Sequence, residues 1–420
     1  MYLTKEISKE QVIQQSIEWW NPGKTKQWQK DGVDLVIGKR EGYYFYDMNG
    51  NRLMDVHLNG GTYNLGHRNP EIISTLKKAL EEFDIGNHHF PSITRAQLAK
   101  ALGKATPDSL HYSILSCGGS EAIDVALKCA RYATKRKKFV SIINGYHGHT
   151  GLAVSLGNER YSKPFLSEGD PSEFKQVPFN DLHAMEAALR NEDVACVIIE
   201  TIPATYGFPL PEKGYLASVK NLCEKYGTLY VADEVQTGLM RTGKLWGIEH
   251  YDVEPDILVT SKGLSGGIYP IAATVVSKRA GQWMNEDGMA HISTFGGSEL
   301  GCMVAMKVLE ISQREEVVQN VNFVSRYLRY ELEKIKQGHS DFFVGIRQLG
   351  VVMGLEFDHK QGAKHVMSSL YENGVWAIYS MLDNRVLQFK PGILCDKDYC
   401  DELLERCELG IKQAARKLGY

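Results

Sequence analysis

Short apolar runs rich in β-branched residues recur along the middle of the chain, and stretches with helical spacing separate them. The runs span residues 112–115, 139–143, 194–199, 228–232, 257–259 and 271–276. Strands that lack polar alternation are typical of parallel sheets with helices on both faces. We therefore predict an α/β protein whose large central domain is built on a mostly parallel sheet.

The flanking segments are predicted to form a smaller α+β domain. Residues 5–19 have the apolar spacing of a helix, and aromatic runs on either side of Asn49-Gly50 indicate a hairpin. A long helix is expected over 300–337, with further elements at 344–358, 362–373, 375–389 and 398–416. The predicted boundaries are 1–75 for the N-terminal part of the small domain, 76–310 for the large domain and 311–420 for the C-terminal part.

Charge and cysteine content narrow the function to small-molecule chemistry. The 48 basic and 51 acidic residues give a net charge of −3, which favours neither a nucleic-acid nor a membrane partner. The 8 cysteines show no paired spacing and are expected to be reduced. The N-terminal residues lack the apolar core of a signal peptide and no apolar stretch has the length of a membrane span, so we expect a cytoplasmic protein.

One predicted strand runs into acidic residues and a glycine turn. The sequence Asp233-Glu234-Val235-Gln236-Thr237-Gly238 follows the 228–232 run, at the strand end where open α/β sheets bind ligands. Alternation places Asp233 and Val235 on one face of the strand and Glu234 on the other. A carboxylate beside an apolar side chain suits a flat heteroaromatic cation, while an aspartate that caps a turn is the alternative.

The next strand is followed by a lysine among small residues. Ser261-Lys262-Gly263 comes directly after the 257–259 run and Thr260. Partial burial and a nearby cation lower the pKa of such an amine, which can then form a Schiff base with a carbonyl. A solvated loop lysine is the alternative interpretation of this segment.

A third strand end precedes both and suits a phosphate. Gly118-Gly119-Ser120 links the 112–115 run to a helical stretch that continues to about Arg131. The free N–H groups and positive dipole of a helix N-terminus bind anions, although a plain serine cap would look the same.

A fourth strand end carries an aromatic residue and two histidines. Tyr146 follows the 139–143 run and can stack on a planar ring. His147 and His149 are two residues apart, but no further ligands stand at metal-binding spacing, so no metal is predicted. A phosphate cradle, a stacking aromatic, a ring aspartate and a Schiff-base lysine together meet the needs of pyridoxal phosphate (PLP).

The chain resembles the class III (ω) aminotransferases of the fold-type I PLP enzymes over residues 35–410. The matching motifs stand in the family order at Asn64–Pro70, Gly119–Ala122, Tyr146–Gly148, Asp233–Gly238, Arg241–Gly243, Lys262 and Thr294–Gly297. The resemblance implies a PLP-binding large domain, an amino donor and a keto or aldehyde acceptor as substrates, and a homodimer with shared active sites.

The resemblance also implies residue roles. Lys262 would form the Schiff base and move a proton during a ping-pong transamination, and Asp233 would keep the pyridine nitrogen protonated. The implied cofactor-binding residues are Gly119, Ser120, Tyr146, His147, Glu200, Asp233, Val235, Gln236, Lys262 and Thr294. Thr294 would reach the cofactor phosphate of the neighbouring subunit.

The substrate-binding residues depart from the family pattern. Gln388 stands where many members have an arginine that grips the substrate carboxylate, and Thr205 replaces a glutamate that pairs with it. Glutamine lacks the guanidinium fork, so substrate recognition is expected to differ. The candidate substrate residues are Gln388, Thr205, Arg385 and Lys390, with Arg68 as a further basic side chain.

Two other functions share this sequence pattern. A PLP-dependent racemase, epimerase or amine lyase of the same family would retain the same cofactor residues. A non-catalytic protein that keeps the fold for binding is disfavoured by the retention of Lys262, Asp233 and Gln236 together.

Overall fold

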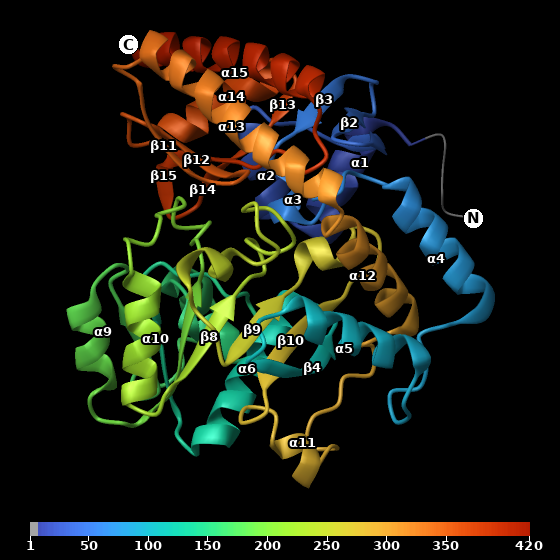
Figure 1. The fold of residues 1–420 in the computed structure, drawn as a ribbon. Coiled ribbons are helices and arrows are strands. Elements are labelled where there is room, and N and C mark those ends of the chain that lie inside the picture. The colour runs from blue at the N-terminus through green and yellow to red at the C-terminus, as the bar shows by residue number, and fades with distance from the viewer. Residues whose placement is uncertain (1–6) are drawn as a thin grey trace.

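The computed structural model describes residues 7–420, and a seven-stranded sheet forms the centre of this described part (Figure 1). Its strands are β4 (Leu110–Ser116), β5 (Lys138–Ile142), β6 (Phe174–Val177), β7 (Val194–Glu200), β8 (Leu229–Asp233), β9 (Ile257–Thr260) and β10 (Ala272–Ser277). They lie in the order β4-β10-β9-β8-β7-β5-β6. Strand β10 pairs antiparallel with β4 and β9, and the other described strand pairs of this sheet are parallel, which confirms a mostly parallel sheet.

Helices cover both faces of the sheet, as the apolar runs predict. Along β8, Val231 packs in a cluster with α6 (Gly119–Thr134), whereas Tyr230 and Ala232 pack in the cluster that contains α10 (Tyr215–Lys225). The other helices around the sheet are α4 (Pro70–Glu82), α5 (Ile93–Ala105), α7 (Ala153–Leu156), α8 (Glu159–Ser162), α9 (Leu182–Leu189), α11 (Trp283–Glu286) and α12 (Glu299–Ser312). Strand β6 was not predicted, because its sequence Phe-Lys-Gln-Val has no apolar run.

The two ends of the chain meet in small sheets on one side of the central sheet (Figure 1). One sheet contains β1 (Ile37–Glu41), β2 (Tyr44–Asp47), β3 (Arg52–Asp55) and β13 (Val375–Trp376), and β13 pairs parallel with β3. The other contains β11 (Phe343–Leu349), β12 (Val352–Phe357), β14 (Ile378–Ser380) and β15 (Asp383–Phe389). The helices of this part are α1 (Lys9–Gln15), α2 (Pro22–Lys30), α3 (Leu58–Gly61), α13 (Glu315–Gly338), α14 (Gly362–Glu372) and α15 (Lys397–Leu418).

Two predicted helices differ in detail. The expected helix over 300–337 is broken after Ser312, where Arg314 takes an extended conformation and its guanidinium pairs with Glu71 and Glu310. The expected helix over 5–19 begins within the described residues at Lys9 and passes into a π-helical turn, Ser16–Trp20, while residues 5 and 6 lie outside them. The predicted hairpin at Asn49-Gly50 is confirmed by the β2–β3 pairing.

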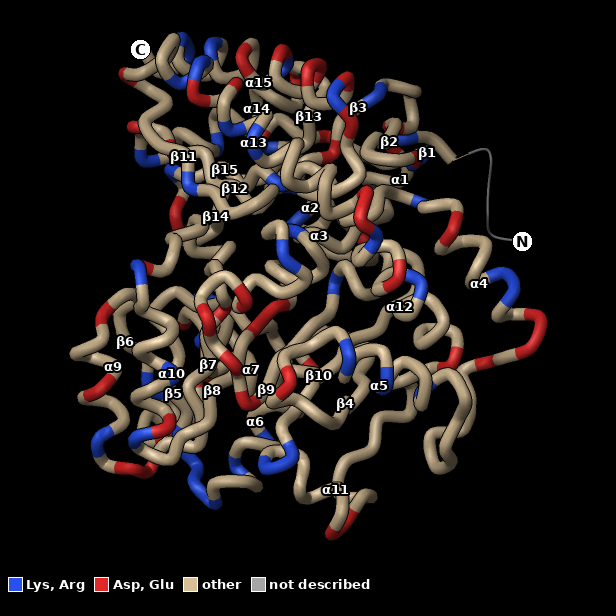
Figure 2. The backbone as a smooth tube through the Cα atoms, in the orientation of Figure 1, with Lys and Arg blue, Asp and Glu red and all other residues tan. Residues whose placement is uncertain are grey.

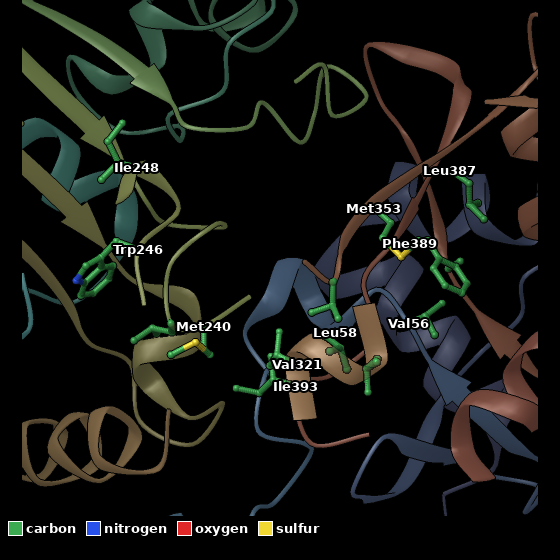
Figure 3. Close-up of a cluster of buried hydrophobic side chains, with 14 of the residues drawn as sticks. Val56, Leu58, Met240, Trp246, Ile248, Val321, Met353, Leu387, Phe389 and Ile393 are labelled. Atoms are coloured by element: carbon green, nitrogen blue, oxygen red, sulfur yellow. The ribbon is translucent and has the colours of Figure 1, made fainter. Parts of the chain in front are cut away.

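One cluster of buried apolar side chains joins the chain ends to the central region. Figure 3 shows part of it, with Val56 and Leu58 from the N-terminal segment, Met240 and Trp246 from the loop after β8, and Phe389 from β15. This cluster fixes the ends of the chain against the strand ends of the central sheet.

The distribution of charged residues and the state of the cysteines agree with the near-neutral charge and the unpaired cysteine spacing of the sequence. Lys and Arg are interspersed with Asp and Glu along the backbone (Figure 2). All 8 cysteines are unpaired, and seven of them are buried. Within residues 7–420, no helix has both the length and the apolar run that crossing a bilayer requires. The cytoplasmic location stays a prediction.

Candidate active site

A cavity of about 300 Å³ lies at the carboxyl ends of β5, β7, β8 and β9. Nine of the ten predicted cofactor residues line it, namely Gly119, Ser120, Tyr146, His147, Glu200, Asp233, Val235, Gln236 and Lys262. Residues 148–150 and Ser261 complete the lining. This is the edge at which parallel sheets bind ligands.

Asp233, the last residue of β8, is buried and held in place by two hydrogen bonds. His147 Nδ1 lies 2.7 Å from its Oδ2, and the backbone N–H of Val235 donates to its Oδ1 at 3.0 Å. Since a carboxylate only accepts, Nδ1 of His147 carries the hydrogen. The imidazole therefore orients a negative charge that borders the cavity.

Glu234 points to the opposite side of the strand, as alternation predicts. Its carboxylate accepts hydrogen bonds from the Thr201 and Thr237 hydroxyls and from the backbone N–H groups of Gly247 and Ile248. Glu234 therefore ties the end of β8 to the loop beyond it and takes no part in the cavity.

Lys262 begins the short 3₁₀ turn that follows β9, and it has a positive φ of 44°. Burial lowers the pKa of its amine, and the nearby carboxylates of Asp233 and Glu200 oppose that shift. Gly60 lies so close that a Cβ there would stand 2.9 Å from Lys262 Cε. The amine is thus enclosed, and its lowered pKa favours the neutral form that a nucleophilic lysine needs.

Glu200 ends β7 and positions the neighbouring aromatic residue. Its Oε1 accepts a hydrogen bond from the backbone N–H of Tyr146 at 2.9 Å. Burial, and to a lesser extent Asp233, raises the pKa of Glu200 to about 7, although His147 opposes the shift. The Tyr146 ring meets Tyr161 edge-on at 5.5 Å and His149 edge-on at 5.2 Å between centroids, so two neighbouring rings fix its orientation.

The N-terminus of α6 provides the phosphate-type site. Gly118 precedes the helix in an extended conformation and gives no side-chain cap, so the first N–H groups of the helix remain available. The Ser120 hydroxyl lies 2.7 Å from the Thr150 hydroxyl, and Thr150 N–H donates to Ser120 Oγ at 2.9 Å. Thr150 is a residue of this site that the sequence analysis did not select.

A second cavity of about 730 Å³ shares Tyr146, His149, Gln236 and Lys262 with the first. It contains three of the predicted substrate residues, which are Thr205, Gln388 and Lys390. Aromatic side chains, including Trp28, Tyr63, Tyr161 and Trp376, line part of the rest, and the charged residues Lys24, Arg40 and Asp55 also line it. An organic substrate that enters here reaches the Lys262 amine.

Arg385 and Arg68 do not join these cavities. Arg385 pairs with Glu356 at 2.9 Å and is exposed on β15, because it stands three positions from Gln388 and so points to the opposite face of the strand. Arg68 is also exposed. The interpretation of Arg385 as a substrate residue is therefore corrected.

Thr294 lies apart from the other cofactor residues within this single chain. It is exposed in the loop between α11 and α12 and lines neither cavity. This position leaves its expected role across a subunit boundary as a prediction.

Several residues at the site were missed. The Asn59-Gly60-Gly61 run could have indicated a close backbone approach, since adjacent glycines at φ of 72° and 95° mark one. Trp28 and Trp376, whose rings meet edge-on at 5.5 Å, had no local sequence signal that placed them at the cavity.

Among residues 7–420, no group of three or more His, Cys, Asp or Glu side chains could hold a metal ion.

Comparisons with known proteins agree with this geometry. The family model described as Aminotransferase class-III matches residues 26–411. An uncharacterized aminotransferase of Archaeoglobus fulgidus is 44% identical over 419 residues, which cover 99% of this chain and 97% of that protein.

Solved structures of aminotransferases have the same fold as this chain. The ornithine aminotransferase of Toxoplasma gondii ME49 has a TM-score of 0.90 at 26% identity, over 98% of this chain and 97% of that one. The taurine:2-oxoglutarate aminotransferase of Bifidobacterium kashiwanohense, solved in complex with PLP and glutamate, also has a TM-score of 0.90, at 24% identity over 99% and 100% of the two chains. The chain is therefore an α/β enzyme that belongs to the class III aminotransferase family.

Proposed function

We propose that this aminotransferase is PLP-dependent and moves an amino group from an amino acid or amine to a keto acid or aldehyde in a ping-pong reaction, with Lys262 as its Schiff-base lysine. The observation that supports this most strongly is one cavity bordered by an enclosed lysine amine, a buried aspartate held by a histidine, and an uncapped helix N-terminus. Those groups match the aldehyde, the ring nitrogen and the phosphate of PLP.

The residues present fit the group chemically. The uncapped N–H groups at Gly119 and Ser120 would hold the phosphate, and Asp233 would face the ring nitrogen. Val235 and Tyr146 would contact the two faces of the ring, both being at the cavity wall. A Cβ at Gly119 would come within 3.3 Å of Val235 Cγ1, so the glycine keeps this wall open.

Lys262 is the residue that handles the proton. When bound, PLP supplies an electron-accepting ring that stabilises negative charge on the substrate carbon. Burial lowers the pKa of Lys262, which suits its amine to take a proton from that carbon and to return it. Asp233, fixed by His147, supplies the negative charge that keeps the ring nitrogen protonated.

Visible absorbance of the purified protein tests this function. We expect a yellow PLP band that bleaches with one amino donor in the absence of acceptor and returns when a keto acid is added. Lys262→Ala should lose the band. A band that persists while a chiral amino acid loses optical activity would indicate a racemase, and no band after PLP is supplied would remove the cofactor assignment.

The homodimer is a further part of the proposal, with Thr294 reaching the cofactor phosphate of the neighbouring subunit. Exposed apolar side chains surround Thr294 in sequence, with Ile292 and Phe295 on its two sides and Met289 nearby. Met289 and Ile292 line a groove of about 480 Å³, to which the segment before and at the start of α5 contributes His88, His89, Pro91, Ser92, Arg95 and Ala96. Exposed apolar groups of this kind are typical of protein–protein interfaces.

Sedimentation of a charged variant tests the dimer. Phe295 is 60% exposed and Phe165, on a different loop, is 76% exposed. We expect Phe295→Glu to shift the protein toward a monomer and to weaken PLP retention, whereas Phe165→Glu should leave both unchanged. Identical sedimentation of the two variants would contradict this interface.

A further inference from the structure

Lys390 is a buried lysine whose charge has no carboxylate partner. It follows β15 directly, is 1% exposed, and lines the second cavity. Its Nζ donates to Gln388 Oε1 at 2.6 Å and to Gln236 Oε1 at 3.2 Å. Both acceptors are neutral amides, and within residues 7–420 Lys390 makes no ion pair. Buried lysines are ordinarily paired with a carboxylate.

The hydrogen bonds that Lys390 donates determine which ends of the two amide groups face the cavity. An ammonium group has three donors and no acceptor, so it holds the carbonyl oxygens of Gln236 and Gln388. The NH₂ groups of both amides then remain as the ends that can face a ligand, and one N–H of Lys390 is left over. Lys390 and the two amides therefore present hydrogen-bond donors to this corner of the cavity.

Charge at this corner favours an anion. Burial lowers the pKa of Lys390 well below its usual value, and the charges of Arg241 and Lys262 lower it further, while Asp55 and Glu200 oppose the shift. The lowered pKa means that the ammonium form is disfavoured while no negative charge compensates it. An oxyanion bound beside Lys390 would supply that compensation and would accept the free N–H donors.

The corner also lies close to the reacting amine. The point where a Gly60 Cβ would stand is 2.9 Å from Lys262 Cε and 3.7 Å from Gln236 Oε1, and Lys390 Nζ is one hydrogen bond beyond that oxygen. A substrate whose amino group reaches Lys262 can place an oxyanion here only if the two groups are separated by few bonds.

We infer that Lys390 and Gln388, beside the cofactor residue Gln236, form the subsite for the substrate carboxylate, and that Lys390 makes the enzyme select amino acids over amines without an anionic group. This inference rests on the proposed transamination. Lys390 acts by binding the substrate, so its loss should affect KM far more than kcat. A charge-assisted hydrogen bond of this kind corresponds to roughly 10- to 100-fold in binding.

The test compares matched donors on the PLP-loaded enzyme. Each amino acid that bleaches the band is paired with the amine that its decarboxylation would leave. We expect Lys390→Met to raise KM for the amino acid about 10- to 100-fold, with kcat within about threefold and the paired amine unaffected. Lys390→Arg should keep much of the preference. Lys360→Met, which changes an exposed lysine, should match the wild type.

A binding measurement separates this inference from the reaction itself. Propionate has a carboxylate but no amine, so its calorimetric titration into the loaded protein reports on the subsite alone. We expect Lys390→Met to weaken propionate binding at least about tenfold. Unchanged propionate binding, or equal losses for amino acid and amine, would overturn the inference. If the wild type binds propionate but transfers no nitrogen, the proposed function fails while the subsite stands.

Discussion

The close approach of Gly60 to Lys262 allows a substitution that perturbs the lysine without changing it. Gly60 has a φ of 72°, and a Cβ there would stand 2.9 Å from Lys262 Cε, well inside the usual carbon–carbon contact of about 3.5 to 4.0 Å. In Gly60→Ala the flexible lysine side chain has to move by roughly 0.5 to 1 Å. A misplacement of about 1 Å can cost about 100-fold in rate.

The matched control is Gly32→Ala. Gly32 has a φ of 78° but no atom within 4 Å of its Cβ position, so it carries the same backbone strain without the contact. Both variants should lose about 1 to 2 kcal/mol of unfolding free energy, because an L-residue is strained in the left-handed region. Only Gly60→Ala should slow the reaction of Lys262 with PLP, by about 10- to 100-fold.

Stopped-flow absorbance after PLP is mixed with the apoprotein measures that rate, and urea unfolding measures stability. Borohydride trapping followed by peptide mapping identifies the lysine that reacted. A Gly60→Ala rate within about threefold of the Gly32→Ala rate would refute the argument that this glycine sets the position of the amine.

Two further substitutions probe the carboxylates at the strand ends. Because burial raises the pKa of Glu200 from 4.5 to about 7, its stabilising contribution is lost as pH rises through that range. Between about pH 4.5 and about pH 8, the apoprotein should lose about 3 kcal/mol more unfolding free energy than Glu200→Gln does, and equal losses would mean that Glu200 ionises normally. Glu234→Ala leaves the buried N–H groups of Gly247 and Ile248 without an acceptor, so urea unfolding should show a loss of about 3 kcal/mol or more. The exposed-site variant Glu212→Ala should change stability by less than about 0.5 kcal/mol, and a similarly small change in Glu234→Ala would contradict its structural role.

The predictable part of the site is the part that local geometry determines. Asp233 and Val235 share a face because side chains alternate along any strand, and Lys262 is placed by the end of the strand before it. The same rule, applied to β15, would have separated Arg385 from Gln388 in advance. The sequence pattern indicated an element over 375–389 but did not identify residues 383–389 as a strand.

Contacts between distant segments could not be predicted. Lys390 reaches Gln236 across 154 residues, and that distance in sequence carries no periodic signal. Likewise, the break after Ser312 coincides with the pairing of Arg314 with Glu71, 243 residues away, and no proline in the 300–337 pattern indicates it. Both contacts form only because the C-terminal segments pack against earlier parts of the chain.

The parallel pairing of β3 with β13 has a consequence for synthesis of the chain. Met54 pairs with Val375, and the backbone carbonyl of Val56 accepts a hydrogen bond from the backbone N–H of Lys390. During synthesis these N-terminal segments therefore lack these partners until about 320 further residues have been made. At about 5 to 20 residues per second, a ribosome needs roughly 15 to 65 s to supply them. The central sheet emerges in the interval, while the unpaired edge of β3 stays exposed and open to pairing with other chains. A transcript truncated before residue 375 would leave that edge uncovered permanently.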